Sequence, residues 1–442
     1  MTGLKRFVDK RFKDFGVNKK REITRLVYEI SKRDKISYKT VLDHIKSGTP
    51  YFAVKDELLR RRFPLSSVAG EPLCPHFPGL KINPKEAVKI NPGKNPRLNP
   101  RYVYIEEDVR NSCLAQRARG IFPAATFKNI VSLKDYIGKR PGFTISDYNR
   151  RRDNIFITSE KYDFFKRCPC TKAALGCGYH ILNLGFGCVF ECTYCYLQEY
   201  TNCPGIILPS NVEDFFDKFG VYKRRGMRIG TGEFTDSLAM DHVTQYSMEI
   251  VEFFKKNQDV TFEFKTKSNN IKNLLKSRHA GNIVVSWSLN PERLVRENEF
   301  YSVSLEERLN AASECVRAGY KVGFHFDPII YGKNWETGYK GLVNSVFDKV
   351  PYKSIAWISL GTFRFNPYLK TIIENRFPEN KILDEELLIG FDGKLRYPAR
   401  LRFFIYENIL EWITKRAKGL YVYLCMEDAE MNKLLNFKKL VK

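Results

Sequence analysis

Apolar and polar positions along this chain follow two regular patterns. In the second half, short β-branched and aromatic runs alternate with amphipathic stretches whose apolar residues recur three and four positions apart. The runs predict strands at 181–184, 227–232, 260–265, 283–289, 320–326 and 354–360. The stretches between them predict helices at 237–256, 270–276, 305–318 and 335–347. Six such β/α units with apolar strands predict an α/β fold built on a parallel sheet, either open or closed into a partial barrel.

The first hundred residues follow different patterns. Residues 1–65 predict a basic, mainly helical N-terminal extension, because two helical stripes of apolar residues occur there: Ile23, Leu26, Val27 and Ile30, then Tyr38, Val41, Leu42 and Ile45. Ser37 is a candidate N-cap for the second helix. Such a helix pair is found in helix-turn-helix units, but a helical cap on the enzyme domain is the favoured interpretation.

Three further segments complete the predicted domain organisation. Residues 66–101 contain KINP twice and then NPGKNPRLNP, which predicts an extended linker, because proline lacks a backbone donor and fixes φ. Residues 102–180 predict an α/β lead-in, and residues 181–442 predict the barrel with its C-terminal elements. Arg150, Arg151 and Arg152 form a local charge run, which predicts a solvated loop.

Polar residues gather where the predicted strands end. They are Gly230, Thr231, Gly232, Glu233, Thr235 and Asp236 after one strand, Lys265, Lys267 and Ser268 after the next, and then Ser286, Ser288, Asn290, His325, Asp327 and Arg364. Because the C-terminal ends of parallel strands meet at one face of a barrel, we expect these groups to line a single mouth.

Three cysteines follow the first of these strands. Cys188, Cys192 and Cys195 have the spacing C-x3-C-x2-C, and soft thiolates favour iron–sulfur clusters. A cubane with three protein ligands leaves one iron open for an exogenous chelate, such as the amino and carboxylate groups of S-adenosylmethionine. The alternative is a tetrahedral zinc site with Cys177 or Cys203 as the fourth ligand. The polar mouth favours the cluster, since a zinc knuckle does not require polar groups to gather around it.

The remaining cysteines bear on a second site and on the compartment. Cys168, Cys170 and Cys177 could hold a second metal centre or could be buried thiols. Six of the eleven cysteines lie between positions 168 and 195, a clustering that indicates metal binding in a reducing compartment, so we expect a cytoplasmic protein. The N-terminal segment carries charges without an apolar stretch behind them, and no apolar run is long enough to span a membrane.

Positive charge is concentrated at the start of the chain. The net charge is +24, and residues 1–160 hold 34 Lys and Arg against 17 Asp and Glu, whereas residues 161–442 hold 40 against 33. A polyanionic partner such as nucleic acid explains this excess, because phosphate neutralisation dominates nucleic-acid affinity. General solubility explains it equally well, so charge leaves both interpretations open.

Several motifs together resemble a known family. These motifs are CVFECTYCYLQEYTN (188–202), TDSLAMDH (235–242), KTK (265–267), WSLN (287–290) and GYKVGFHFDPIIY (319–331). All five are similar to segments of the radical S-adenosylmethionine enzymes of the spore photoproduct lyase-like group. The resemblance covers residues 101–442 and implies a partial (β/α)6 TIM-type barrel. It also implies a 4Fe–4S cluster on Cys188, Cys192 and Cys195, bound S-adenosylmethionine, and a reducing partner such as flavodoxin or ferredoxin.

The resemblance also implies roles for individual residues. Cofactor contacts are expected from Gly230, Thr231, Gly232, Glu233, Thr235, Lys267, Ser288 and Asn290. Tyr194 and Tyr196 match a tyrosine pair linked to hydrogen return in the lyase. The lyase's hydrogen-donating cysteine is absent, since Glu233 stands at its position, and a carboxylic O–H bond is too strong to give hydrogen readily to a carbon radical. Cys425 is the other candidate donor, or else a buried strand cysteine.

The sequence therefore predicts an enzyme that cleaves S-adenosylmethionine reductively and acts on nucleic acid or a nucleotide. Two alternatives stay open. One keeps the radical chemistry and changes the substrate to a peptide or small metabolite. The other is a non-catalytic, metal-stapled nucleic-acid-binding protein.

Overall fold

The computed structural model describes residues 2–70, 73–90, 97–161, 164–170 and 173–435. The chain divides into two units: residues 1–89 with 362–402, and residues 90–361 with 403–442. Each unit combines segments that are distant in the sequence. All the predicted chemistry except Arg364 lies in the second unit.

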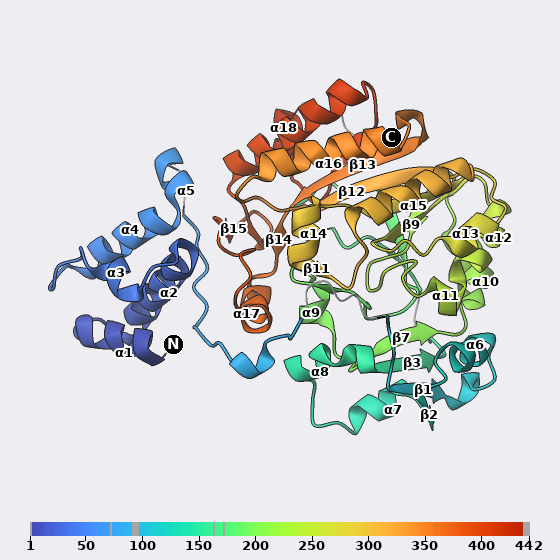
Figure 1. Cartoon of the computed structure of the whole chain (residues 1–442), viewed down its shortest axis with the longest axis horizontal. Helices are drawn as coiled ribbons and strands as arrows, with labels where there is room; N and C mark the ends of the chain where they lie inside the picture. Colours follow the sequence, from blue (N-terminus) through green and yellow to red (C-terminus); the bar gives the residue numbers. More distant parts are fainter. Residues whose placement is uncertain (1, 71–72, 91–96, 162–163, 171–172, 436–442) are drawn as a thin grey trace. The chain divides into compact units, whose positions relative to one another are not determined.

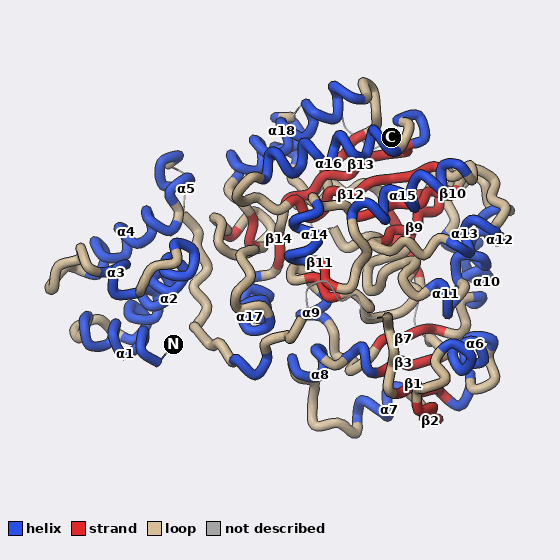
Figure 2. Tube along the Cα trace, viewed as in Figure 1, coloured by secondary structure: helices blue, strands red, loops and turns tan. Residues whose placement is uncertain are grey.

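A large curled sheet forms the centre of the second unit (Figures 1 and 2). Its spatial order is β17 (Val422–Leu424), β13 (Ile355–Thr362), β12 (Lys321–Ile329), β10 (Ile283–Ser288), β9 (Thr261–Thr266), β8 (Arg228–Gly230), β5 (Tyr179–Leu182) and β4 (Phe165–Arg167). The paired strands from β5 through β12 are parallel, β17 is parallel to β13, and β4 is antiparallel to β5. All six residues of β10 are buried, as expected for a strand covered on both faces.

Helices cover the outer face of this sheet (Figure 1). The helices of this unit include α10 (Glu213–Tyr222), α11 (Asp241–Thr244), α12 (Tyr246–Lys255), α13 (Lys272–Lys276), α14 (Glu292–Asn298), α15 (Leu305–Arg317), α16 (Trp335–Lys349), most of α18 (Ala399–Arg416) and α19 (Ala429–Leu434), with the short η4 (Tyr352–Ser354) before β13. Ser304 begins α15 with a capping box, in which the Ser304 hydroxyl accepts from the Glu307 N–H and the Glu307 carboxylate accepts from the Ser304 N–H.

A second, smaller parallel sheet belongs to the same unit. Its order is β2 (Thr126–Ile130), β1 (Tyr102–Glu106), β3 (Asn154–Thr158) and β7 (Ile206–Pro209), so it joins the lead-in to a strand that follows the cysteine loop. The associated helices are η2 (Glu107–Val109), α6 (Cys113–Ile121), α7 (Leu133–Gly138), α8 (Ile145–Asn149) and η3 (Arg151–Asp153). Val103, Ile105, Ile155 and Ile157 pack in one core cluster with Cys192. The smaller sheet therefore supports the cysteine loop.

The other unit is mainly helical. It contains α1 (Thr2–Arg11), α2 (Val17–Asp34), α3 (Tyr38–Leu42), α4 (Tyr51–Arg62), α5 (Pro64–Ala69), η1 (Pro84–Glu86), α17 (Pro367–Arg376) and a small sheet of β14 (Arg364–Phe365), β16 (Leu395–Arg396) and β15 (Leu388–Ile389). The Arg25 guanidinium is buried and donates to both Glu29 and Glu374. This shared ion pairing explains how residues near position 374 join the N-terminal helices in one unit.

The structure confirms the predicted fold class. The six predicted strands correspond to β5, β8, β9, β10, β12 and β13, and the structure adds β4 and β17 at the two edges. The predicted N-cap is also present, because the Thr40 N–H donates to the Ser37 hydroxyl at 3.1 Å. The bounds of the four predicted segments stay predictions. Across the described residues, every helix is too short or too polar to traverse a lipid bilayer.

Candidate active site

The cysteine loop lies at the C-terminal end of β5, where parallel-barrel enzymes place their chemistry. β6 (Glu191–Cys192) is part of this loop and pairs with β11 (Glu299–Phe300), and α9 (Leu197–Tyr200) follows the third cysteine. The Thr193 N–H donates to the Asn298 carbonyl at 2.9 Å, and the Thr193 hydroxyl donates to Asn298 Oδ1 at 2.8 Å. The loop is thus fixed against residues more than a hundred positions away.

Arg151 holds the loop from the smaller sheet. Its side chain is fully buried, Nη1 donates to Glu191 Oε2 at 2.7 Å, Nη2 donates to the Phe190 carbonyl at 2.5 Å, and Nε donates to the Cys188 carbonyl at 3.2 Å. The prediction of a solvated loop is therefore wrong for Arg151. The sequence offered no signal for this role, because an arginine run looks the same whether one member is buried or all are exposed.

Glu299 holds the loop from the opposite side. The carboxylate accepts from the Tyr194 hydroxyl, from Asn290 Nδ2 at 3.0 Å and, as an ion pair, lies 2.7 Å from Arg308 Nη1. Although burial disfavours the charged form, the Arg308 and Lys267 cations lower the pKa of Glu299 to about 2. Glu299 is therefore a buried anion, and Tyr194 is one of its donors. Neither Glu299 nor Arg308 was predicted from the sequence.

Glu233 lies at the end of β8 beside Tyr196. The Lys166 ammonium is 2.7 Å from Glu233 Oε2, and the Tyr196 hydroxyl donates to the Glu233 backbone carbonyl. Burial raises the pKa of Glu233 and Lys166 opposes that shift. Tyr196 is 40 % exposed. Glu233 is thus a half-buried carboxylate that already accepts from one ammonium group.

The close packing at the end of β8 leaves little room for a side chain at either of its two glycines. A Cβ at Gly230 would lie 1.9 Å from the Tyr179 hydroxyl, and Gly232 has φ +97° with the Lys265 carbonyl 3.0 Å from where a Cβ would lie. Thr231 is buried, and its hydroxyl bonds to that of Ser237. Backbone packing therefore requires both glycines, whatever else binds there.

Asp236 organises the next strand end. Its carboxylate accepts from the Thr266 hydroxyl at 2.6 Å, from the Lys267 N–H at 2.7 Å and from the Ala239 N–H at 2.9 Å. The half-buried Lys267 ammonium lies 5.8 Å from the centre of the Tyr194 ring. Burial lowers the pKa of Lys267, but the Glu299 carboxylate and the Cys192 thiolate raise it by a larger amount. The net shift of the pKa is therefore upward. Lys267 is thus a cation next to the cysteine loop.

The other predicted contacts occupy different environments. Ser288 is buried, and its backbone carbonyl accepts from Arg308 at 2.9 Å. Asn290 is also buried: its Oδ1 accepts from the Tyr339 hydroxyl at 2.7 Å while its Nδ2 donates to Glu299. Thr235 is half-buried. The structure brings Tyr194 and Asn290 to the same carboxylate, that of Glu299. The cofactor roles of all these residues stay predictions.

The chemistry of the three loop thiols fits a thiolate-held cluster. Burial raises their pKa values, to about 12 for Cys188, but cations and backbone N–H groups counter this. The Phe190 N–H donates to Cys188 Sγ at 3.5 Å, Lys267 favours the Cys192 thiolate, and Arg151 favours those of Cys188 and Cys195. Among the described residues no three His, Cys, Asp or Glu side chains are drawn together at metal-ligand distances, and this holds for the loop cysteines too.

The accessory cysteines form a thiol pair beside this loop. Cys170 Sγ lies 3.7 Å from Cys168 Sγ, and this contact, followed by burial and the nearby Cys425 and Cys177, raises the pKa of Cys168. Cys425 follows β17, and its N–H donates to the Leu360 carbonyl at 2.7 Å. In the described part of the chain these thiols make no metal-binding group, so the predicted second metal centre is not supported. Cys203, the alternative zinc ligand, is buried separately with Tyr104 and Phe156.

Inside the barrel, Glu263 collects the polar side chains of its neighbours. Its Oε1 accepts from the Ser286 hydroxyl at 2.5 Å and from Trp357 Nε1 at 3.1 Å. The same oxygen lies 2.7 Å from His325 Nε2. The other oxygen, Oε2, accepts from Arg228 at 2.8 Å. Burial lowers the pKa of His325 to about 4. His325 was expected among the polar groups that line the mouth, and the structure pairs it with Glu263. A glutamate in the middle of an apolar strand was the sequence signal for this network.

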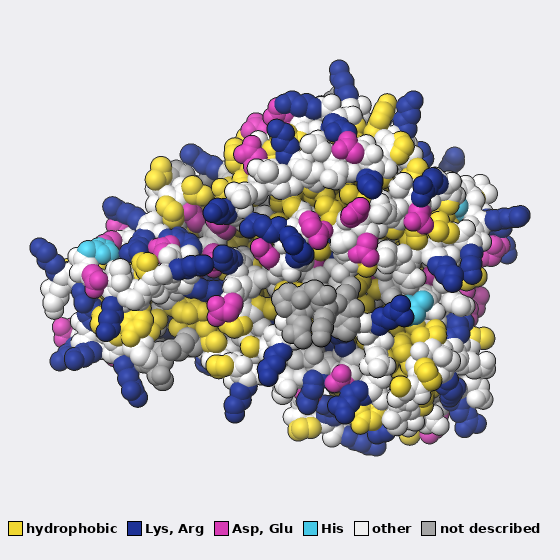
Figure 3. All heavy atoms as spheres, viewed as in Figure 1, with side chains coloured by type: hydrophobic (Ala, Val, Ile, Leu, Met, Phe, Trp, Pro, Cys, Tyr) yellow, Lys and Arg dark blue, Asp and Glu magenta, His cyan; other side chains and the backbone are white. Residues whose placement is uncertain are grey.

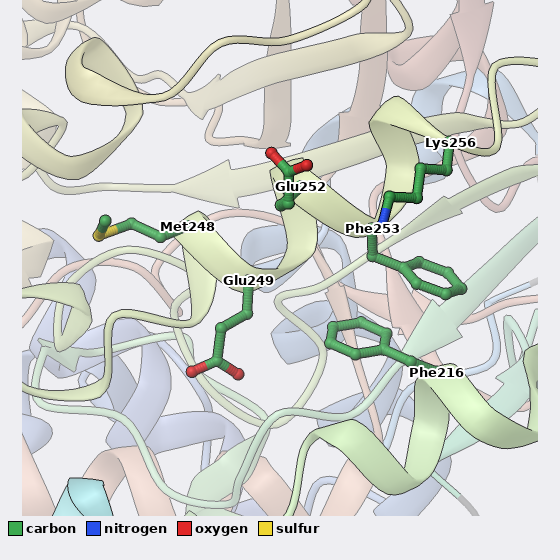
Figure 4. Close-up of a pocket in the computed structure, with 6 residues that line it drawn as sticks. All are labelled: Phe216, Met248, Glu249, Glu252, Phe253 and Lys256. Carbon is green, nitrogen blue, oxygen red and sulfur yellow. The ribbon is translucent and has the colours of Figure 1, made fainter.

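A shallow pocket on the outer helices does not coincide with this chemistry. It lies between α10 and α12 and is lined by Phe216, Met248, Glu249, Glu252, Phe253 and Lys256 (Figure 4). None of the predicted site residues lines it. The candidate site is therefore the mouth that carries the cysteine loop.

Comparisons with known proteins agree with this geometry. The model of the spore photoproduct lyase family matches residues 166–394. Spore photoproduct lyase of Clostridium acetobutylicum is 29 % identical over 206 residues, and that of Bacillus subtilis is 30 % identical over 212 residues. Each alignment covers 45 % of this chain and 61 % of the relative, so the chain spans less than two thirds of these proteins' length.

Solved structures show the same fold. A spore photoproduct lyase complexed with dinucleoside spore photoproduct superposes with a TM-score of 0.64 at 23 % identity, covering 75 % of this chain and 100 % of that one. A lyase mutant with bound AdoMet and dinucleoside spore photoproduct gives the same TM-score at 24 % identity and the same coverage. The half-barrel and its cysteine loop are those of the radical S-adenosylmethionine enzymes. Within that class, the chain belongs to the spore photoproduct lyase family.

Proposed function

We propose that this protein cleaves S-adenosylmethionine reductively at a 4Fe–4S cluster held by Cys188, Cys192 and Cys195. The observation that carries the proposal is the double anchoring of the cysteine loop, by Arg151 on one side and Glu299 on the other, at the mouth of the half-barrel. Such anchoring would hold the three thiols as cluster ligands, and S-adenosylmethionine would bind at the iron that has no protein ligand. When bound, the cluster and S-adenosylmethionine would supply a 5′-deoxyadenosyl radical that abstracts hydrogen.

The chain's own residues would bind and shield these groups. Glu233 is proposed to accept from the ammonium of the methionine moiety, because it already accepts from the Lys166 ammonium in the same half-buried position. Lys267 and Arg151 would offset the negative charge of the thiolates. Thr231, Thr235, Ser288 and Asn290 stay proposed contacts of the same cofactor, as do Gly230 and Gly232 through their backbones.

We propose nucleic acid or a nucleotide as the substrate. The excess of Lys and Arg in residues 1–160 supports this, as does the dinucleoside spore photoproduct named in the structural relatives. Repair of thymine photoproducts in particular is not proposed, since Glu233 cannot act as a hydrogen donor as a cysteine would. Tyr194, Tyr196 and Cys425 stay candidates for hydrogen return. A flavodoxin or ferredoxin in the cytoplasm is proposed as the source of electrons.

The test is anaerobic reconstitution of the full chain followed by dithionite and S-adenosylmethionine. We expect 5′-deoxyadenosine from the wild type and none from Cys192→Ala, with Cys113→Ala, an exposed cysteine, as the matched control. Absence of 5′-deoxyadenosine from protein that carries about four irons and four sulfides would contradict the proposal. Purified protein with zinc and no sulfide would support the non-catalytic alternative instead.

A further inference from the structure

The N-terminal helices carry an unusual density of unpaired positive charge. Residues 2–21 hold eight Lys and Arg against two Asp. Lys10, Lys13, Lys19 and Arg21 are exposed, and none of the four forms a salt bridge within the described residues. Lys and Arg side chains are visible over the surface of the N-terminal helices in Figure 3. Two buried arginines of the same unit, by contrast, are paired with carboxylates: Arg25 with Glu29 at 2.7 Å and Arg62 with Glu29 at 2.8 Å.

The turn between α1 and α2 brings these charges together. The Lys20 ammonium donates to the Lys13 carbonyl at 3.1 Å, which joins the start of α2 to the end of α1. The first turn of α2 contains no acidic residue. Basic side chains from the two helices therefore share one corner of the unit.

An exposed aromatic side chain borders the same corner. Phe52 is 76 % exposed, and its ring centre lies 5.2 Å from that of Tyr51. The Lys19 ammonium lies 5.0 Å from the centre of the Tyr51 ring. An apolar ring left in solvent beside lysines is the combination that single-stranded nucleic acid uses, since phosphates meet the cations and a base stacks on the ring.

We infer that this basic corner, defined as Lys10, Lys13, Lys19, Arg21 and Phe52, binds single-stranded nucleic acid. The inference rests on the proposed function for the class of its partner, but it assigns binding to a part of the chain that precedes the family match at residues 166–394. The contact would follow the phosphate backbone and stack on one base, so it would be strong at low salt and tolerant of sequence.

An anionic membrane is the competing partner for a basic helix, and the packing of α1 argues against it. A helix that lies on a bilayer inserts its apolar face. The apolar face of α1 is already buried, because Leu4 and Val8 are 6 % and 0 % exposed in the core of their own unit, together with Phe12, which follows the helix. The polar face is what α1 presents to solvent.

The experiment measures fluorescence anisotropy of a labelled single-stranded oligothymidylate with the full chain, from about 50 to about 200 mM salt. Lys10→Ala/Lys13→Ala/Lys19→Ala should lower the slope of log K against log salt by about two and weaken binding on the order of 100-fold near 0.1 M salt. The matched control is Lys218→Ala/Lys256→Ala/Lys353→Ala, three exposed lysines of the other unit, which should leave both quantities unchanged.

Phe52→Ala tests the stacking contact separately. It should weaken binding on the order of tenfold without changing the salt slope, while Tyr352→Ala, which removes another exposed ring, should not. Equal losses in the two lysine variants, unchanged binding in both, or preferential capture by vesicles of anionic phospholipid would each overturn the inference. Cleavage of S-adenosylmethionine without nucleic acid should be the same in every variant, so a failure of the proposed activity is distinguishable from a failure of this surface.

Discussion

Arg151 and Glu191 form a buried ion pair, with Nη1 2.7 Å from Oε2 and side-chain exposures of 0 % and 3 %. The pair links the smaller sheet to the residue directly before Cys192. Because the same guanidinium also donates to the Phe190 and Cys188 carbonyls, one side chain contacts three residues of the cysteine loop. The cysteine loop is therefore anchored by a residue outside the segment that the family model matches.

Arg151→Ala should destabilise the protein by about 3–5 kcal/mol, because it leaves Glu191 as an uncompensated buried charge. It should also reduce the iron retained per chain. Arg150→Ala is the matched control: that side chain is 66 % exposed, and its loss should change stability by less than about 0.5 kcal/mol. Urea unfolding and iron analysis check both. Equal behaviour of the two variants would show that Arg151 does not support the loop.

Replacing Cys168, Cys170 and Cys177 together by alanine should leave about four irons per chain, because these thiols form no metal-binding group in the described residues. Replacing Cys188, Cys192 and Cys195 together should remove the iron. Iron and acid-labile sulfide in anaerobically purified protein provide the measurement. About eight irons per chain in the wild type and about four in the first variant would show that the second metal centre exists.

The two tyrosines of the loop should respond differently to loss of the hydroxyl. Tyr194→Phe removes a donor from the buried Glu299 carboxylate and should cost about 1–3 kcal/mol. Tyr196 is 40 % exposed and donates to a carbonyl at the mouth, so Tyr196→Phe should cost less than about 1 kcal/mol. Urea unfolding of the two variants separates a structural role from a role at the mouth. Equal costs would refute this distinction.

Glu233→Gln should weaken S-adenosylmethionine binding by about ten- to a hundredfold, since a hydrogen bond to a charged group contributes about 1.5–3 kcal/mol. Isothermal titration calorimetry of the cluster-loaded protein measures this. Glu213→Gln, an exposed carboxylate on α10, is the control and should bind normally. An unchanged affinity of Glu233→Gln for S-adenosylmethionine would show that Glu233 does not contact the cofactor.

Acid should destabilise the barrel through His325. Burial lowers its folded pKa to about 4, below the ordinary value of 6.5, so the unfolded state binds more protons between these two values. The His325 contribution is thus fully present above pH 6.5 and is lost as pH falls toward 4, by up to about 3 kcal/mol. His325→Gln should flatten stability against pH over this range, whereas His44→Gln, 49 % exposed, should not. Urea unfolding at stepped pH gives the slopes.

Local sequence determined much of this protein. The alternation of apolar runs and amphipathic stretches was sufficient for the six parallel strands, because that periodicity reflects which faces must be buried. The spacing of Cys188, Cys192 and Cys195 predicts a cluster loop for a similar reason, since three thiols so close in the sequence need no distant partner. Glu263 also carried a signal, as a charge in an apolar strand must be paired inside the barrel.

Only the tertiary structure decided what surrounds the loop. Arg151 lies 40 positions from Glu191, and Glu299 lies more than a hundred from Tyr194, so no local pattern marks either partner. The free energy of a buried charge depends on which opposite charge folding brings beside it, and that choice is made by long-range packing. For the same reason the sequence placed Arg150, Arg151 and Arg152 in one class, whereas the fold buried Arg151 and left Arg150 in water.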